Sequence, residues 1–145
     1  MFDQKTMKKV SISALIMIGL LAASNLFGQG KLEVTVKNIK DQKGSIMVSL
    51  FSNEKDFLEK TIDSKVVMVS ATEATVIFEK LIPGEYAVSV IHDLNDNKKL
   101  DTGFMGIPKE PYGFSNNARG QFGPPSYESS KLVVKGEVRT SITVQ

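Results

Sequence analysis

The chain has 145 residues, with 18 basic side chains, 16 acidic side chains and no cysteine. The absence of cysteine excludes disulfides, thiolate metal sites, a cysteine nucleophile and a lipoprotein cleavage site. The basic residues are not clustered as they are in proteins that bind nucleic acid, so we expect no nucleic-acid partner.

The first 28 residues have the pattern of a secretory signal peptide. Three lysines within the first ten residues precede an apolar run at 12–21, and small residues follow in "AASNLFGQG". The run is too short to span a hydrocarbon core of roughly 30 Å. We therefore expect cleavage after Gly28, or earlier near Ala23. The product, residues 29–145, would be a single exported domain, periplasmic or secreted, without a transmembrane span.

From residue 31 onward, apolar and polar side chains alternate with the period of β-strands. In the first segment, for example, Leu32, Val34 and Val36 would share one face. The expected strands are 31–39, 45–51, 65–70, 74–81, 84–93, 131–136 and 138–145. A helical turn is expected only at 52–60, where Phe57 and Leu58 would cover one end of the core. Seven strands bounded by turns predict an all-β fold, a Greek-key β-sandwich, with a barrel as the alternative.

Residues 101–130 break the strand pattern. They contain five glycines and four prolines, and they also hold more than half of the aromatic residues found after residue 28. Long loops without secondary structure are usually either functional or disordered. Disordered segments are poor in aromatics. We therefore expect an ordered loop over residues 104–127 that packs against one end or face of the sandwich.

The stretch "HDLNDNKKLD" leads into this loop and has the spacing of a calcium-binding loop. Position 1 would be Asp93, followed by Asn95, Asn97, Lys99 through its main-chain carbonyl, and Asp101. Lys98 stands where such loops place glycine, and the bidentate glutamate is missing, so a cation would need help from Glu110 or from loop carbonyls. The alternative is a hairpin loop in which Asp and Asn side chains bind nearby backbone N–H groups.

The stretch "EPYGFSNNARG" offers a second candidate site. Its members combine aromatic planes with amide and guanidinium donors, as ligand sites do; they are Tyr112, Phe114, Asn116, Asn117 and Arg119. The alternative is a loop packed by its own aromatics, with Arg119 bound to loop carbonyls or to Glu110.

The only histidine, His92, shares the inward face of the strand 84–93 and is expected to be structural. Together with Ser115 it could form a hydrolase pair, although no nucleophile elbow surrounds that serine.

The stretch from His92 to Glu128, with "GIPKEPYGFSNNARG" at its centre, resembles bacterial secreted proteins of the domain of unknown function 2141 family. The upstream segments "LEVTVKNIKDQKGSIMVSLFSNEKDFL" and "LIPGEYAVSVIHD" extend the resemblance over residues 29–145. The resemblance implies an exported β-sandwich similar to prealbumin-like or carboxypeptidase-regulatory-like domains, and it implies no activity. With the strand pattern, we expect a sandwich of the immunoglobulin-like or prealbumin-like kind.

These patterns together predict a non-catalytic binding or accessory module. Its ligand, an envelope glycan, a peptide or a small molecule, would be recognised by the surface formed by residues 92–128. The alternatives are a structural protein that docks on an envelope partner protein through the aromatic loop, and a hydrolase that uses His92 and Ser115.

Overall fold

The computed structural model of the chain describes residues 28–145. The expected signal peptide therefore lies outside the described residues, except for Gly28. The strands are β1 (Gly30–Lys37), β2 (Ser45–Phe51), β3 (Asp63–Met68), β4 (Ala74–Leu81), β5 (Gly84–Asp93), β6 (Tyr112–Phe114), β7 (Leu132–Val134) and β8 (Glu137–Thr143). The short helices are η2 (Phe104–Gly106), η3 (Ser115–Asn117) and α2 (Tyr127–Ser130). No helix among these residues is long and apolar enough to cross a bilayer.

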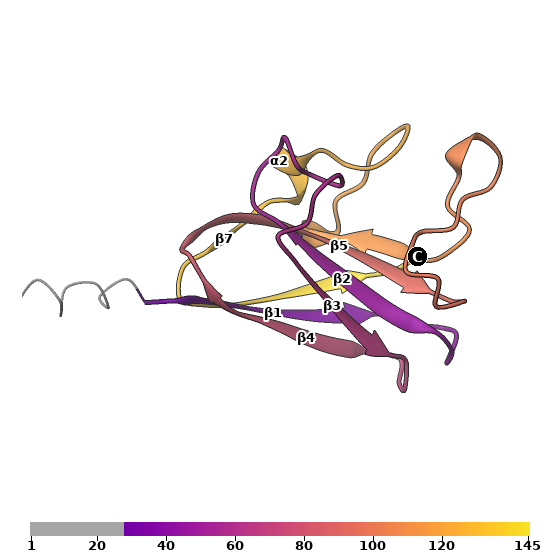
Figure 1. Cartoon of the computed structure of the whole chain (residues 1–145), viewed down its shortest axis with the longest axis horizontal. Helices are drawn as coiled ribbons and strands as arrows, with labels where there is room; N and C mark the ends of the chain where they lie inside the picture. The colour runs from indigo at the N-terminus through magenta and orange to yellow at the C-terminus, as the bar shows by residue number, and fades with distance from the viewer. Residues whose placement is uncertain (1–27) are drawn as a thin grey trace, which may run out of the picture.

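The strands form two sheets that lie against each other (Figure 1). One sheet has the order β4-β1-β8, and the other has the order β3-β2-β5-β6, with β7 paired to β5. The pairing is antiparallel except between β1 and β8, which run parallel. The expected two-sheet, mostly β architecture is confirmed, and each of the seven expected strands is present.

The core lies between the two sheets and follows the alternation of the sequence. The inward side chains of β1 face those of β2 and β5, and all are at most a few per cent exposed; they include Leu32, Val34, Val36, Ile46, Val48, Leu50, Tyr86, Val88 and Val90. Burying one such side chain fully is worth about 1.5–3 kcal/mol. The apolar core therefore supplies the stability that disulfides give to many exported domains.

The segment 101–130 is less irregular than expected, because it contains the short strand β6. This strand pairs with β5 on one side. On the other side, Tyr112 and the chain end Gln145 exchange backbone hydrogen bonds of 3.4 and 3.2 Å. Gly113 allows the close approach to β8, since a Cβ at this position would lie 2.9 Å from the Thr143 carbonyl oxygen. β6 thus closes one edge of the sandwich.

The turn at 52–60 does not cover the end of the core, because its Phe57 packs against Phe51, whose side chain lies on the outer face of the larger sheet. The Phe57 ring packs edge-on against Phe51, with centroids 5.3 Å apart, and also against Tyr127 at 5.7 Å. Leu58 does not cover the core: its backbone has a φ of 64° and its side chain is 38% exposed. Leu58 lies beside Phe51 and Phe114 on the rim of an open groove on this outer face.

Candidate functional site

The outer face of the larger sheet carries a row of apolar side chains that crosses four strands. The strand register places Met47 opposite both Val66 and Ile91, and Ile91 opposite Tyr112. Residues directly opposite each other in an antiparallel pair point to the same face. The outer face of such a sheet is normally polar, because it meets water. An apolar row here is therefore an unusual surface, and it forms the floor of the candidate site.

A second row of the floor carries hydroxyl groups. Ser49 lies opposite both Ser64 and Ser89, and Ser89 lies opposite Phe114. The Oγ atoms of Ser49 and Ser64 are 3.3 Å apart. The floor thus presents an apolar strip with a parallel strip of hydroxyls beside it.

One wall is a loop that we name the first finger, residues 101–109. Its two arms are joined by backbone hydrogen bonds, from Lys109 N to Asp101 O at 2.8 Å and from Gly103 N to Ile107 O at 2.7 Å. The tip is a tight turn in which Met105 and Gly106 both have positive φ, 57° and 73°. This combination is the type I′ turn of β-hairpins, in which Asn-Gly is preferred. A methionine in this conformation costs roughly 1–2 kcal/mol, so the finger is a rigid hairpin with a strained apolar tip.

The opposite wall is the second finger, residues 119–124. Gly120 permits its tight bend, because a Cβ there would lie 2.2 Å from the Gly123 carbonyl oxygen. Phe122 projects from the tip and is fully exposed. Both fingers rise from the same side of the sandwich, in orange at the upper right of Figure 1.

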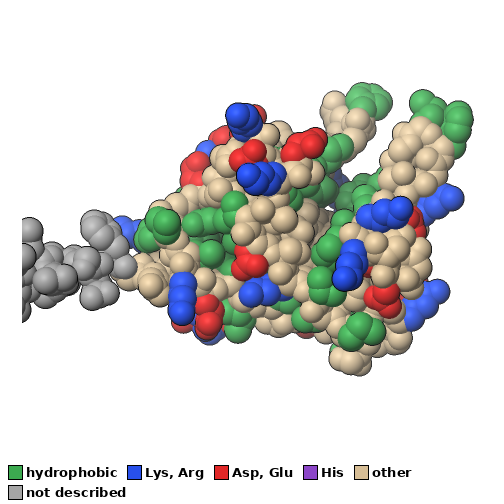
Figure 2. All heavy atoms as spheres, in the orientation of Figure 1, with side chains coloured by type: hydrophobic (Ala, Val, Ile, Leu, Met, Phe, Trp, Pro, Cys, Tyr) green, Lys and Arg blue, Asp and Glu red, His purple; other side chains and the backbone are tan. Residues whose placement is uncertain are grey.

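Between the fingers and above the floor lies an open groove of about 1000 Å³. Figure 2 shows it as a hollow with hydrophobic side chains between two projections whose ends are also hydrophobic. Its lining includes Met47, Ile91, Leu100, Met105, Tyr112 and Phe122. Ligand sites in proteins are commonly clefts of about 300–1000 Å³ with a mainly apolar lining. The groove is therefore large enough for a small molecule or a short peptide.

Of the five predicted ligand residues, two line this groove. The rings of Tyr112 and Phe114 lie there, edge to face, with centroids 5.9 Å apart. The two asparagines hold the fold instead. The Nδ2 of Asn116 donates to the carbonyls of Lys131 and Ser129, at 2.8 and 3.2 Å. Asn117 Oδ1 accepts from Thr143 N at 2.9 Å.

Arg119 does not have the structural role expected as the alternative. Its side chain is exposed, and it makes no hydrogen bond or ion pair with any residue from 28 to 145. Glu110, its expected partner, is bound elsewhere. Arg119 instead borders a small hollow of about 110 Å³ beside Tyr112 and Gln145. Tyr112, Phe114 and Asn117 line the same hollow, so four of the five predicted ligand residues border it.

Two of the five loop aromatics also differ from expectation. Tyr112, Phe114 and Tyr127 pack against the sandwich, but Phe104 and Phe122 stand in solvent at the finger tips. Both fingers bend sharply away from the sheet, so their tips cannot reach a surface that would cover them. The loop packs as expected at its base and projects at its two ends.

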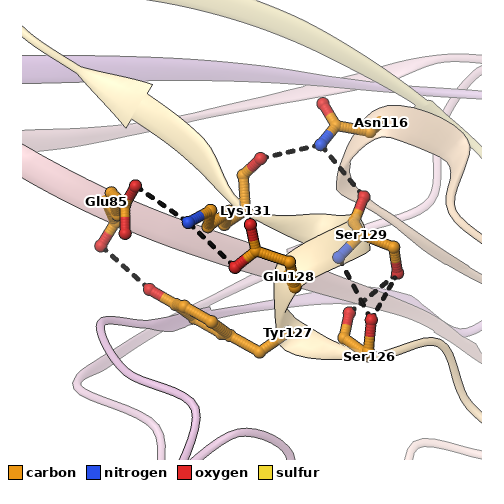
Figure 3. A network of polar contacts seen from close by, with 7 residues as sticks. All are labelled: Glu85, Asn116, Ser126, Tyr127, Glu128, Ser129 and Lys131. Atoms are coloured by element: carbon orange, nitrogen blue, oxygen red, sulfur yellow. Dashed lines mark hydrogen bonds and ion pairs between the residues drawn. The ribbon is translucent and has the colours of Figure 1, made fainter.

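A polar network around α2 fixes the return of the loop to the sandwich (Figure 3). Lys131 Nζ lies 2.9 Å from Glu128 and 3.0 Å from Glu85, and these hydrogen bonds, with Glu128 first, raise the pKa of Lys131 to about 12. Tyr127 Oη donates to the Glu85 carbonyl at 3.2 Å. The network therefore holds the C-terminal end of the second finger against β5.

The Asx-rich loop between β5 and the first finger is built as a self-bonded turn. Asp93 accepts from the backbone N–H groups of Lys98 and Asn97, at 2.6 and 3.1 Å. Asp101 accepts from the side-chain amides of Asn95 and Asn97, at 2.6 and 2.8 Å. These are the contacts expected of the hairpin alternative.

A cation at this loop would have to displace these donors. The expected ligand oxygen of Asn97, Oδ1, accepts the N–H of Lys99 at 3.1 Å, a bond that leaves the Lys99 carbonyl uninvolved. Within residues 28–145 no three His, Cys, Asp or Glu side chains are grouped to hold a metal ion. Calcium binding by Asp93, Asn95, Asn97, Lys99 and Asp101 stays a prediction.

Glu110 was expected to supply a further oxygen ligand to a cation in the Asx-rich loop, but it binds backbone N–H groups at the two ends of that loop instead. Its buried carboxylate accepts from Leu94 N at 2.8 Å and from Asp101 N at 2.9 Å. These two groups begin and end the Asx-rich loop. Glu110 therefore clamps the loop shut and fixes the base of the first finger.

The Asx-rich loop predicts a titration that can be measured. Hydrogen bonds from Asn97 and then Asn95 hold the pKa of Asp101 below its ordinary value of 3.8. A depressed pKa means that folding favours the charged form, so this contribution to stability is present above 3.8 and is lost as the pH falls through the lower folded value. We expect the Asp101 carboxyl carbon to titrate below 3.8 by NMR, and Asn97→Ala to move the midpoint upward.

Repeating this titration with millimolar Ca²⁺ tests the cation expectation. A bound cation would lower the Asp101 midpoint further and raise the melting temperature by mass action. An unchanged midpoint and melting temperature would leave the loop as a turn. Asn53→Ala, which removes an exposed amide from a distant turn, is the matched control and should leave the Asp101 titration unchanged.

The two residues of the hydrolase alternative are both fully buried. Ser115 Oγ accepts from Val88 N at 2.8 Å and donates to the Ser130 carbonyl. His92 Nε2 lies 2.9 Å from the Lys43 carbonyl oxygen, while its Nδ1 has no hydrogen-bond partner among the described residues. The geometry gives both side chains structural positions and does not pair them.

Sequence reasoning missed the floor of the groove and the finger tips. A signal for the floor is present in "SIMVSLF" and "YAVSVIHD", where both alternating faces carry apolar residues. A strand that is apolar on both faces is normally covered on both. The outward residues Met47 and Ile91 could have been recognised in this way.

No curated protein and no solved structure matches the chain. A family model, described as an uncharacterized protein conserved in bacteria (DUF2141), matches residues 34–142, which run from the middle of β1 to near the end of β8 and include the Asx-rich loop and both fingers. The chain therefore belongs to the DUF2141 family of bacterial proteins.

Proposed function

We propose that the protein is an exported, non-catalytic binding module that holds an elongated amphipathic ligand in the groove between the two fingers. The observation that carries this proposal is the apolar row across the open face of the larger sheet. Met47, Ile91 and Tyr112 lie side by side in the register and line an open groove, bordered by the two fingers and by Leu58, Glu59 and Thr61 of the β2–β3 loop. A ligand that covers this row would remove its apolar surface from water.

The two rows of the floor define the chemistry of the ligand. An apolar body, such as an acyl chain or an apolar peptide segment, fits over Met47 and Ile91. Hydroxyl or amide groups along one side of it would meet Ser49 and Ser89. A glycan fits less well, because sugars need many hydrogen-bond donors and acceptors around an aromatic platform, and this floor offers an apolar strip instead.

The remaining expectations belong to the same proposal. The charged start and apolar run of residues 1–28 support export to the periplasm or medium. Two face-to-face sheets with a shared core support a Greek-key topology of the immunoglobulin-like or prealbumin-like kind. The burial and backbone hydrogen bonds of Ser115 and His92 support binding without catalysis.

The test is a fluorescence titration with the apolar probe N-phenyl-1-naphthylamine, whose emission rises in apolar surroundings. We expect saturable binding to the native protein. Replacing the floor with Met47→Gln and Ile91→Gln together should weaken binding at least about tenfold, because burial of each apolar side chain is worth on the order of 1–2 kcal/mol.

The matched control is Ile77→Gln, which removes a partly exposed apolar residue from β4 of the other sheet. It should bind the probe as the native protein does. Equal loss in the floor variant and the control, or no loss in either, would contradict the groove as the binding site.

A further inference from the structure

The tips of the two fingers carry an exposed apolar surface that extends beyond the groove, because Phe104 does not line the groove at all. Phe104 is 86% exposed, Met105 83%, Ile107 63% and Phe122 102%. Exposed single apolar residues are common, but a gathering of large ones usually marks an interaction site. Figure 2 shows these ends as the outermost hydrophobic points on one side of the molecule.

The first finger presents its apolar tip on a rigid support. Its arms are bonded from Asp101 to Lys109, with a bridge between Thr102 and Pro108 inside them. Met105 occupies a turn position that favours Asn or Gly, at a φ of 57°. Backbone strain of this kind persists where the surrounding structure imposes it and often marks a functional position.

Basic side chains surround the base of the first finger. Lys98 lines the groove beside the finger, Lys99 follows it in an exposed position, and the Lys109 stem lies against the finger backbone at Gly103. Figure 2 shows Lys and Arg side chains gathered below the right-hand projection. Arg119 adds a positive charge at the base of the second finger.

The acidic residues of this region only partly offset these charges. Asp96 is exposed. The Asp101 carboxylate keeps its negative charge, because hydrogen bonds from the neutral amides of Asn97 and Asn95 hold its pKa low, whereas the carboxylates of Asp93 and Glu110 are buried. At the surface, four exposed basic side chains therefore outnumber the acidic ones, and we name them the basic collar: Lys98, Lys99, Lys109 and Arg119.

We propose that the two fingers insert their tips into the surface of an anionic phospholipid bilayer. Apolar side chains that enter the boundary between headgroups and acyl chains, with lysines left at the headgroup level, combine the two contributions that hold interfacial proteins on membranes. A protein partner fits these tips less well, because protein interfaces bury a packed central patch, whereas here two separate points flank an open groove. This inference does not depend on the ligand of the groove.

The first test is co-sedimentation of protein from the exported fraction with vesicles of phosphatidylcholine alone or mixed with phosphatidylglycerol. We expect binding to the mixed vesicles that weakens as salt rises. Phe104→Asp with Phe122→Asp should lower the partition coefficient at least tenfold. Ile82→Asp, at a 79% exposed apolar site on the β4–β5 turn, should leave it unchanged. All variants carry the same N-terminal residues, so any binding by the apolar run at 12–21 is common to them.

The charge part of the proposal has its own pair of variants. Lys98→Gln, Lys99→Gln and Lys109→Gln together should weaken binding to anionic vesicles, while Lys40→Gln with Lys43→Gln, on the β1–β2 turn, should not. An equal effect of the two sets on vesicle binding would overturn the role proposed for the basic collar. Melting curves confirm that each exposed variant is folded.

The second test uses tryptophan as a reporter, since the chain contains none. Phe104→Trp should show a blue shift of its emission with anionic vesicles, and Ile82→Trp should show no shift. Two results would overturn membrane insertion: a native protein that does not bind vesicles, or a Phe104→Trp protein that binds them without a shift of its emission. Either result would favour a protein partner for the tips.

These assays distinguish a failure of the membrane proposal from a failure of the groove proposal. The floor variant with Met47→Gln and Ile91→Gln should bind vesicles as the native protein does. The finger variant with Phe104→Asp alone, at a tip residue outside the groove lining, should bind vesicles more weakly but retain N-phenyl-1-naphthylamine in the groove. A finger variant that lost both vesicles and probe would contradict separate sites.

Discussion

Replacing Gly44 with alanine should lower the free energy of unfolding by about 3 kcal/mol or more, from the cost of a left-handed conformation together with overpacking. Gly44 has a φ of 71°, and a Cβ there would lie 2.1 Å from the Asp93 carbonyl oxygen and 2.9 Å from the Leu94 Cα. Both contacts are with backbone atoms, which cannot rotate away as a side chain can. Chemical denaturation measures the change.

Gly136→Ala is the control that separates strain from contact. Gly136 has nearly the same φ, 73°, but a Cβ there would meet nothing within 4 Å. Gly136→Ala should lower the free energy of unfolding by only roughly 1–2 kcal/mol, the cost of the left-handed conformation for alanine. Equal losses of stability at the two positions would show that the contact with the start of the Asx-rich loop does not contribute to the effect of Gly44→Ala.

Replacing Glu110 with alanine should lower the free energy of unfolding by about 3 kcal/mol. The two backbone N–H groups of Leu94 and Asp101 would lose a charged acceptor. Hydrogen bonds to charged groups are worth about 1.5–3 kcal/mol each, partly recovered where water can enter. The base of the first finger should loosen as well, and faster hydrogen exchange at Leu94 and Asp101 reports this directly.

Two further variants test whether this loss of stability comes from the Glu110 carboxylate. Glu110→Gln keeps one carbonyl acceptor and should lose less than the alanine variant. Glu79→Ala removes an exposed carboxylate from β4 and should change stability by less than about 0.5 kcal/mol, as surface substitutions usually do. A Glu110→Ala protein as stable as Glu79→Ala would refute the clamp.

The sheets could be predicted from the sequence, because a two-residue period with one apolar face specifies both strand and orientation. β6 could not, since three residues, Tyr112 to Phe114, are too few to show a period. Its position depends on hydrogen bonds with β5 and with the distant Gln145. Only the assembled fold brings these segments together.

The sequence predicted part of the candidate site, its walls within residues 92–128, but neither its floor nor its chemistry. The sequence placed a ligand surface in residues 92–128, and Tyr112 and Phe114 do line the groove. Asn116 and Asn117 are polar residues that a ligand could use, yet their side chains satisfy backbone groups of Lys131 and Thr143. Composition cannot distinguish these roles, because the partner of a polar side chain is set by tertiary structure.

The most direct test of the groove is an NMR chemical-shift map of the backbone amides, recorded as N-phenyl-1-naphthylamine is added. A ligand on the floor should shift the amides of Met47, Ser49, Ser89, Ile91 and Tyr112, which share one face of the larger sheet. The chemical shifts of the amides of β1 and β4, on the other sheet, should not change. Shifts confined to β1 and β4, or spread evenly over both sheets, would contradict the groove as the ligand site.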